Sequence, residues 1–420
     1  MRSRERSAES EAIGHLSRGL ALLETLDESP ERDARELAMV RALGAAYIAS
    51  RGYSADGVGP VFARARELSE RVGQPTQVFA SMFGSWVFHF TRGDFRRCME
   101  LANEGMEFAN RLGDRGIVME ALKWVGQTML YRADFAGARD RLAMAVDQYD
   151  CPEDKRDWAA YTSTDPRVAN RCHLAMSLWH LGFPDQALRI NREMRELARA
   201  VGHPFTLGYA LHHTGLLHQC CRLGTEVQTA GEESLAISTE LGFAWWIASG
   251  TFYKGAGMIH QGKLEEAIPL IRKGIHAWRA TGAELILPVQ LGALGDACTQ
   301  ARRFEDARLA LDEGLAIAQK NDERFQEAEL HRLEGELLLA ESPDQTAAAE
   351  ETFRQAIKTA QRQLSRGWEL RATMSLSRLW QRQGRHDEAR AALAAVYNTY
   401  TEGFTTPDLV DAAAMLETRS

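Results

Sequence analysis

The chain has 420 residues, of which 45% are hydrophobic and 26% are charged, a balance typical of a folded globular protein. Its 50 basic and 58 acidic residues give a formal net charge of −8, which argues against a protein that coats nucleic acid. No apolar run approaches the ~18 residues of a membrane-spanning helix, and the first residues do not resemble a secretory signal. We therefore expect a cytoplasmic protein with neither a nucleic-acid nor a membrane partner.

Small residues recur along the chain at intervals of 40. Gly215, Gly255, Gly295 and Gly335 form one such register, and Ala175 precedes it by the same interval. Two further registers have the same spacing: Ser234, Gly274 and Gly314, and Val227, Ala267 and Ala307. Because several registers share one period, the sequence indicates an internal repeat.

Each unit of the repeat contains two segments with helical spacing of apolar residues, separated by a short break. We predict about nine such helix pairs, with one further helix at about 9–26. In chain order, the breaks inside the pairs are predicted near residues 52–58, 93–95, 133–135, 182–185, 222–225, 262–264, 302–304, 341–346 and 384–386. Glycine ends the first helix of many pairs, and acidic residues often begin the second.

The spacing inside a unit matches the tetratricopeptide pattern. A small residue, such as Gly255, lies twelve positions before the small residue of the second helix, here Ala267, and a large residue, Met258, lies nine before it. The period exceeds the usual ~34 residues, so we expect longer helices. The sequence therefore predicts an all-α, tetratricopeptide-like right-handed α-solenoid of about nine helix pairs, in which stacked neighbours form one continuous core.

The predicted domain organisation is simple. Residues 1–8 are expected to be a flexible N-terminus, and residues 9–417 a single tetratricopeptide-like helical repeat array. A polar loop insertion at 150–165 interrupts the array, since 49 residues rather than 40 separate Gly126 from Ala175. Such a loop either contributes to binding or is a tolerated insertion, and the sequence leaves both interpretations open.

Several strings in the chain resemble one known group of proteins. Examples are "AIGHLSRGLALLETL" (12–26), "LGFPDQAL" (181–188), "WRATGAEL" (278–285) and "YTEGFTTPDLVDAAAML" (400–416). Together they resemble the C-terminal tetratricopeptide region of large bacterial predicted ATPases, many of which also carry a class III adenylate/guanylate cyclase domain. The resemblance covers about residues 10–417. It implies a regulatory repeat arm of a bacterial signalling ATPase or cyclase.

No motif in this chain points to catalysis. Residues 257–264, "GMIHQGKL", imitate a phosphate-binding loop, but Leu264 stands where Ser or Thr must hold Mg²⁺, and nothing resembles a cyclase domain. "HHTGLLHQCC" (212–221) is the best candidate for a zinc site. However, His218 occupies the large-residue register of the repeat, so we interpret it as a packing residue. We predict no enzyme activity, no cofactor and no metal site.

The first helices of the repeats are expected to line a concave groove. Their inward positions in the N-terminal two-thirds are mainly aromatic residues and histidines. We predict that the partner-binding groove consists of Phe83, Phe90, Lys123, Gln127, Tyr131, Trp179, His180, Tyr209, His212, Phe252 and His260. Rings with polar tips serve both as core and as binding anchors. The corresponding positions further along are charged: Asp296, Glu329, Arg332, Glu336, Arg371, Arg378 and Arg382.

These observations predict a protein–protein interaction or sensor scaffold that binds a protein or peptide partner in its groove. The alternative is a small-molecule-sensing repeat domain of a transcription or cyclase regulator, with an effector pocket between the 150–165 loop and the first helices of the fourth and fifth repeats. The sequence does not identify the partner, the stimulus or the oligomeric state.

Overall fold

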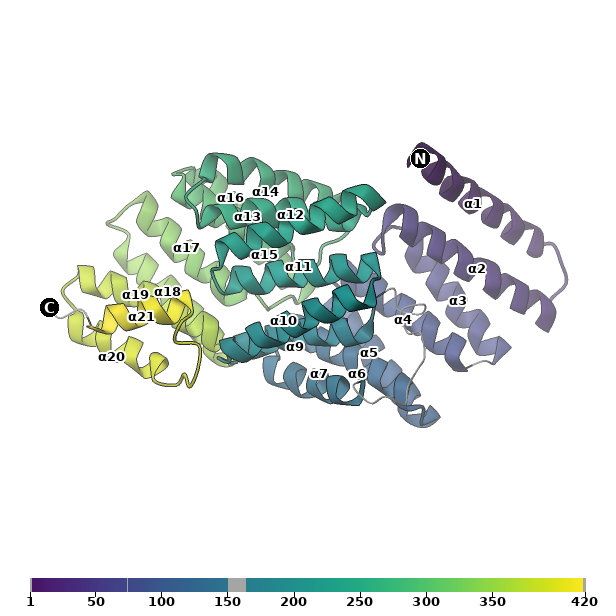
Figure 1. The fold of residues 1–420 in the computed structure, drawn as a ribbon, viewed down its shortest axis with the longest axis horizontal. Coiled ribbons are helices and arrows are strands. Elements are labelled where there is room, and N and C mark those ends of the chain that lie inside the picture. Colours follow the sequence, from purple (N-terminus) through teal and green to yellow (C-terminus); the bar gives the residue numbers. More distant parts are fainter. Residues whose placement is uncertain (1, 74, 150–163, 418–420) are drawn as a thin grey trace.

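The structure, a computed structural model, describes residues 2–73, 75–149 and 164–417. Over these ranges the chain forms twenty helices and no strand, which confirms the predicted all-α class. The helices stack into an elongated array, with the N-terminal helices at one end and the C-terminal helices at the other (Figure 1). None of the helices in the described ranges has the length and apolarity needed to cross a bilayer.

The helices pair as the repeat predicts, with nine pairs in the described ranges. They are α2 (Pro30–Arg51) with α3 (Val58–Val72), α4 (Pro75–Thr91) with α5 (Phe95–Leu112), α6 (Arg115–Tyr131) with α7 (Phe135–Tyr149), α9 (Pro166–His180) with α10 (Pro184–Val201), α11 (Pro204–Cys220) with α12 (Gly224–Leu241), α13 (Ala244–Ile259) with α14 (Leu264–Arg279), α15 (Leu287–Gln300) with α16 (Phe304–Asn321), α17 (Glu327–Glu341) with α18 (Thr346–Arg362), and α19 (Arg366–Arg382) with α20 (His386–Tyr397). α1 (Arg2–Leu23) precedes the pairs, and α21 (Pro407–Glu417) follows them.

The division into residues 1–8 and 9–417 stays a prediction. The loop insertion predicted at 150–165 lies outside the described residues, except for Thr164 and Asp165.

The turns inside the pairs share one backbone conformation. Gly93, Gly182 and Gly262 have positive φ angles of 77°, 89° and 71°, a region that glycine adopts without steric cost. At the equivalent positions Arg222 and Arg302 also have positive φ, 59° and 58°. The turn geometry of the repeat therefore persists where the sequence no longer has glycine.

The small residues of the 40-residue register lie where paired helices touch. A Cβ added at Gly295 would lie 2.6 Å from Leu311 Cδ2, and one at Gly335 would lie 2.5 Å from Phe353 Cε1. Both distances are far below ordinary van der Waals contact. The period seen in the sequence is thus the spacing at which paired helices require a small residue.

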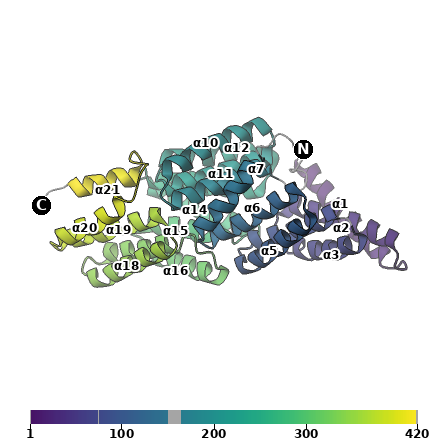
Figure 2. The same cartoon turned by 90° about the horizontal axis from the view of Figure 1, so that it is seen from below.

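The array also curls until distant repeats meet. Arg132 Nε donates to Asp322 Oδ2 at 2.8 Å although 190 residues separate them, nearly five repeats. Beside this contact the carbonyl of Tyr131 accepts from the N–H of Phe325 at 3.1 Å. Turned by 90°, the array shows α16 and α18 on the same side as α5 (Figure 2). The inner end of α6 is therefore covered by repeats further along the chain.

Candidate functional site

In the described part of the chain, two cavities on the inner face are lined by residues of the predicted groove or of its charged continuation. The first, which we call the aromatic cavity, has a volume of about 70 Å³. Its lining consists mostly of rings, with a few polar groups between them. The lining residues are Tyr53, Phe83, Trp86, Val87, Phe90, Thr91, Lys123, Gln127, Tyr131, Thr164, Ala169, Phe205, Tyr209, His212, His213, Trp245, Trp246, Trp278 and Leu285.

The wall of the aromatic cavity is built where the second halves of α4 and α6 face the first halves of α11 and α13. Two of its rings are held by hydrogen bonds as well as by packing. Trp86 Nε1 donates to Thr128 Oγ1 at 3.2 Å, and Trp278 Nε1 donates to the carbonyl of Leu285 at 2.9 Å. Because its rings are fixed, the cavity is formed before any ligand arrives.

Lys123 is the only Lys, Arg, Asp or Glu in this lining as far as the structure describes it. Its Nζ lies 2.5 Å from Glu120 Oε2, and both side chains are almost fully buried. The same ammonium lies 5.7 Å from the centroid of the Phe83 ring, within cation–π range. The carboxylate of Glu120 neutralises the ammonium, so the aromatic cavity carries little net charge.

The two histidines of this lining are held neutral by burial. Desolvation lowers the pKa of His213 to about 4 and lowers that of His212 well below its usual value. His212 Nδ1 lies 2.7 Å from Ser249 Oγ, and His213 Nδ1 lies 3.0 Å from the carbonyl of Tyr209. Near neutral pH, the aromatic cavity therefore presents uncharged rings to a ligand.

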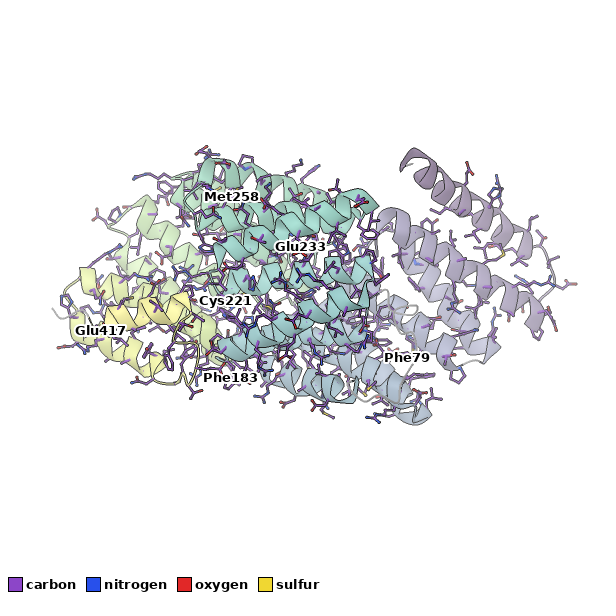
Figure 3. All side chains as sticks on the ribbon, in the orientation of Figure 1. Phe79, Phe183, Cys221, Glu233, Met258 and Glu417 are labelled. Carbon is purple, nitrogen blue, oxygen red and sulfur yellow. The ribbon has the colours of Figure 1, made fainter. Side chains whose placement is uncertain are left out.

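The second cavity, which we call the charged cleft, has a volume of about 230 Å³. It lies where the ends of α11 and α13 meet the first helices of the last repeats and α21. Its lining residues are Gln219, Cys220, Arg222, His260, Val289, Gly292, Ala293, Asp296, Gln300, Gln326, Glu329, Arg332, Leu333, Trp368, Arg371, Met374, Arg378 and Asp408. Figure 3 shows the neighbouring Cys221 at this junction, between the teal helices and the yellow C-terminal helices.

An ion-pair network forms the floor of the charged cleft. Arg371 Nη2 contacts Asp408 Oδ2 at 2.5 Å and donates to the carbonyl of Cys220 at 2.6 Å. Arg332 Nε and Nη2 donate to the two oxygens of Glu329 at 2.7 and 2.8 Å. Burial raises the pKa of Glu329, but the two arginines outweigh it and lower the pKa overall. Both carboxylates of the floor are therefore ionised at neutral pH.

The structure brings together most of the predicted groove residues. Seven of the eleven line the aromatic cavity: Phe83, Phe90, Lys123, Gln127, Tyr131, Tyr209 and His212. His260 instead lines the charged cleft. Almost all of the eleven are buried, because the curl of the array covers them. Their role in binding stays a prediction.

The other three predicted residues pack between helices. The ring of Trp179 meets that of Trp368 edge-on at 4.7 Å between centroids. His180 stacks on Phe135 at 3.8 Å, and Phe252 is fully buried. These contacts join repeats, and none of the three side chains lines either cavity.

Sequence reasoning missed several rings of the aromatic cavity. Trp245 and Trp246 line it from the start of α13, Trp278 from the end of α14, and Tyr53 from the turn after α2. The Trp245–Trp246 doublet was a visible signal, because large rings in sequence cannot both face one side of a helix. Trp278 and Tyr53 lie outside the first helices, where the groove was expected.

The His–Cys cluster of α11 is engaged in packing. His218 Nε2 lies 3.3 Å from Asn191 Nδ2, and burial raises the pKa of the Cys220 thiol to about 12. In the described ranges, no three His, Cys, Asp or Glu side chains are grouped so that they could hold a metal ion. Residues 257–264 form the end of α13 and its turn into α14.

Comparison with known proteins leaves the family open. No family model matches the chain. An uncharacterized protein of Rhizobium meliloti is 22% identical over 380 residues, which cover 90% of this chain and 36% of that protein. The chain thus spans about a third of the length of this curated relative.

Solved structures with related architecture are tetratricopeptide-like repeat proteins. One is a signal transduction ATPase with a tetratricopeptide repeat sensor from Pyrococcus horikoshii (12% identity, TM-score 0.40, 97% of this chain and 65% of that one). Another is a Rap protein in complex with competence and sporulation factor (10% identity, TM-score 0.39, 98% of this chain and 99% of that one). A third is yeast Tom70 (10% identity, TM-score 0.38, 99% of this chain and 96% of that one). With TM-scores below 0.5, function has to be argued from the geometry of this chain.

Proposed function

We propose that the chain is a protein-interaction and sensing arm whose partner inserts an apolar or aromatic side chain into the aromatic cavity. One observation carries this proposal. Seven residues chosen by their repeat position alone, from α4, α6 and α11, converge on a single preformed cavity. This convergence supports the proposal of a binding site on the inner face.

The size of the aromatic cavity favours an inserted side chain. A volume of about 70 Å³ has room for one ring or branched chain and is too small for a folded segment. Burying such a group gains roughly 1.5–3 kcal/mol from the hydrophobic effect. Fixed walls reduce the entropy that binding costs. The remainder of the partner would lie along the helices around the cavity.

We further propose that the arm works as part of a larger bacterial signalling protein of the ATPase or cyclase type. The strings at 12–26, 181–188, 278–285 and 400–416 support this placement through their resemblance to such proteins. The length of the curated relative, of which this chain spans 36%, supports it as well. In this proposal the arm contributes recognition, and another module contributes the output.

A small-molecule effector is the second candidate, favoured by two buried donors. Among the described residues, the Nε1 groups of Trp245 and Trp246 have no hydrogen-bond partner, although both residues line the aromatic cavity. A small aromatic molecule with an acceptor atom would satisfy one of them. Thr164, Ala169 and Tyr209 place the cavity beside the first helices of the fourth and fifth repeats, where this alternative expects its pocket.

Affinity capture with a cavity-filling variant tests the main proposal. Ala169 lines the aromatic cavity, so Ala169→Leu should fill it and remove the partners that wild-type chain retains from its native cells. Leu309→Gln is the control, because Leu309 on α16 is 63% exposed. Equal retention by wild type and Ala169→Leu would contradict the proposal.

A thermal-shift assay separates the two candidates. If the cavity serves an effector, phenol or indole should raise the melting temperature of wild type and leave that of Ala169→Leu unchanged. If it serves only a side chain of a polypeptide, these probes should give no saturable shift in either protein.

A further inference from the structure

Arg378 differs from the other arginines of the charged cleft. Arg222 pairs with Asp408 and Asp411 at 2.9 and 2.7 Å, and Arg332 and Arg371 pair with the carboxylates of the cleft floor. For Arg378, by contrast, the structure has no carboxylate within 4.0 Å among the described residues. Its side chain is half-buried and lines the cleft.

The surroundings of Arg378 make this unpaired charge costly. Desolvation is the largest cause that lowers its pKa, and the positive charges of Arg332 and Arg222 lower it further. The nearest opposing charges, Glu336 and Asp411, are already bound by Arg332 and Arg222 respectively. Neither Glu336 nor Asp411 is therefore free to pair with Arg378.

The charged cleft is also lined by hydrogen-bond acceptors. Gln326 is 5% exposed and lines the cleft, and its Oε1 has no hydrogen-bond partner in the part of the chain that the structure describes. Gln219 Oε1 likewise has no hydrogen-bond partner among the described residues. Asp296 adds a carboxylate whose hydrogen bond comes from Gln300 at 3.0 Å on the same helix. A buried acceptor without a donor is unfavourable, so a ligand with N–H groups would be favoured here.

We propose that the charged cleft is a second ligand site, in which Arg378 binds a carboxylate and Gln326 accepts from an N–H group of the same ligand. The planar guanidinium suits a carboxylate because two of its N–H groups can bind the two oxygens. A carboxylate close to N–H donors is the combination of groups that characterises amino acids. It is found both in free amino acids and in acidic residues of a polypeptide.

The cleft volume agrees with such a ligand. About 230 Å³ exceeds the space that one carboxylate requires and leaves room for the amino or amide group. This site is independent of the aromatic cavity and of the function proposed for it, since none of the residues that line the cleft also lines that cavity.

Isothermal titration of the full chain tests the site with two probes. Free L-glutamate represents the small-molecule source, and a capped peptide, acetyl-Gly-Glu-Gly-amide, represents the polypeptide source. We expect saturable binding of one or both probes to wild type, and at least a tenfold loss of affinity in Arg378→Gln. Binding of glutamate alone would assign the cleft to an effector, and binding of the peptide would assign it to a partner.

A matched variant controls for charge. Arg382→Gln removes one positive charge one turn further along α19, at an exposed position outside the cleft, and should bind like wild type. Gln326→Leu, which removes the orphaned acceptor, should weaken binding less than Arg378→Gln does. If neither probe binds wild type, or if Arg378→Gln and Arg382→Gln bind equally well, the proposal is wrong.

Discussion

The aromatic cavity and the charged cleft are built from the same type of helix in the same type of array, yet their chemistry is opposite. Both lie where the ends of earlier first helices meet the starts of later ones. The aromatic cavity has one internally neutralised ammonium among neutral rings, whereas the cleft has four arginines and three carboxylates. The repeat thus fixes where cavities form, and the side chains at a few positions decide what each can bind.

The two regions also differ in what holds them together. The aromatic cavity is stabilised by burial of rings, such as Trp86 stacked on Phe90 at 4.7 Å, and is insensitive to salt. The cleft depends on buried ion pairs, in which the loss of one partner leaves the other without compensation. Substitution, pH and cavity filling should therefore affect the two regions differently.

The largest effect is expected from Arg371→Met in the cleft. This change leaves Asp408 and Glu329 each with one cation fewer and removes the donor to the carbonyl of Cys220. The free energy of unfolding should fall by about 3–5 kcal/mol, as measured by urea denaturation. Arg354→Met, at an exposed pair with Glu350, should change it by less than about 1 kcal/mol. A loss below 1 kcal/mol for Arg371→Met would contradict the role of the network.

Acid should weaken the two regions in separate pH ranges. The pKa of His213 is about 4 in the folded chain and about 6.5 when unfolded, so between these values the unfolded chain binds more protons. The stability that neutral His213 contributes is complete above pH 6.5 and falls by about 3 kcal/mol on going to pH 4. The pKa values of Glu329 and Asp408 are lowered from 4.5 and 3.8, so their contribution is complete above these ordinary values and is lost as the pH falls below them.

Urea denaturation at a series of pH values checks this order. In His213→Phe, which cannot titrate, stability should decline less between pH 6.5 and 4 than in wild type. The loss below pH 4 should remain. An identical profile for the two proteins would show that His213 is not held neutral by burial.

Filling the aromatic cavity should be tolerated. Ala169 and Ala175 both lie buried on α9, but only Ala169 lines the cavity. Ala169→Leu should change the free energy of unfolding by less than about 1.5 kcal/mol, whereas Ala175→Leu, in the register where paired helices touch, should cost about 1–3 kcal/mol or more from overpacking. Thermal or urea denaturation of both variants measures the difference. Equal costs would mean that no usable space exists beside Ala169.

The smallest effect is expected from Arg378→Gln. Because Arg378 has no ion pair in the described residues and lies near Arg332 and Arg222, its replacement removes repulsion along with charge. The free energy of unfolding should change by less than about 0.5 kcal/mol or rise slightly. A loss above 1 kcal/mol would reveal a structural role for Arg378 and would call for Arg378→Lys in the binding assay.

The sequence predicted the repeat well because its causes are local. A glycine such as Gly262 marks a turn with positive φ, and Gly295 marks a close helix contact, so both are visible in one unit. It also predicted that positions such as Glu329 and Arg371 make the later inner face charged. These features follow from helix geometry within 40 residues.

The features that the sequence did not predict depend on the curvature of the whole array. To predict the contact between Tyr131 and Phe325, one must know the rotation from each repeat to the next over nearly five repeats. No local sequence pattern encodes this rotation. The pairing of Arg371 with Asp408 involves α21, which lies outside the repeat. For this reason the sequence found residues of the inner face but predicted one continuous groove, where the described part of the structure has two separate cavities.

Hydrogen exchange of the chain, measured with and without its captured partner, tests the central claim most directly. We predict that the partner increases protection in peptides from α4, α6, α11 and α13, whose residues form the aromatic cavity, and leaves α5, α12 and α16 unchanged. Protection confined to these second helices, with no change in the first helices, would show that the partner binds the outer face and would contradict the account.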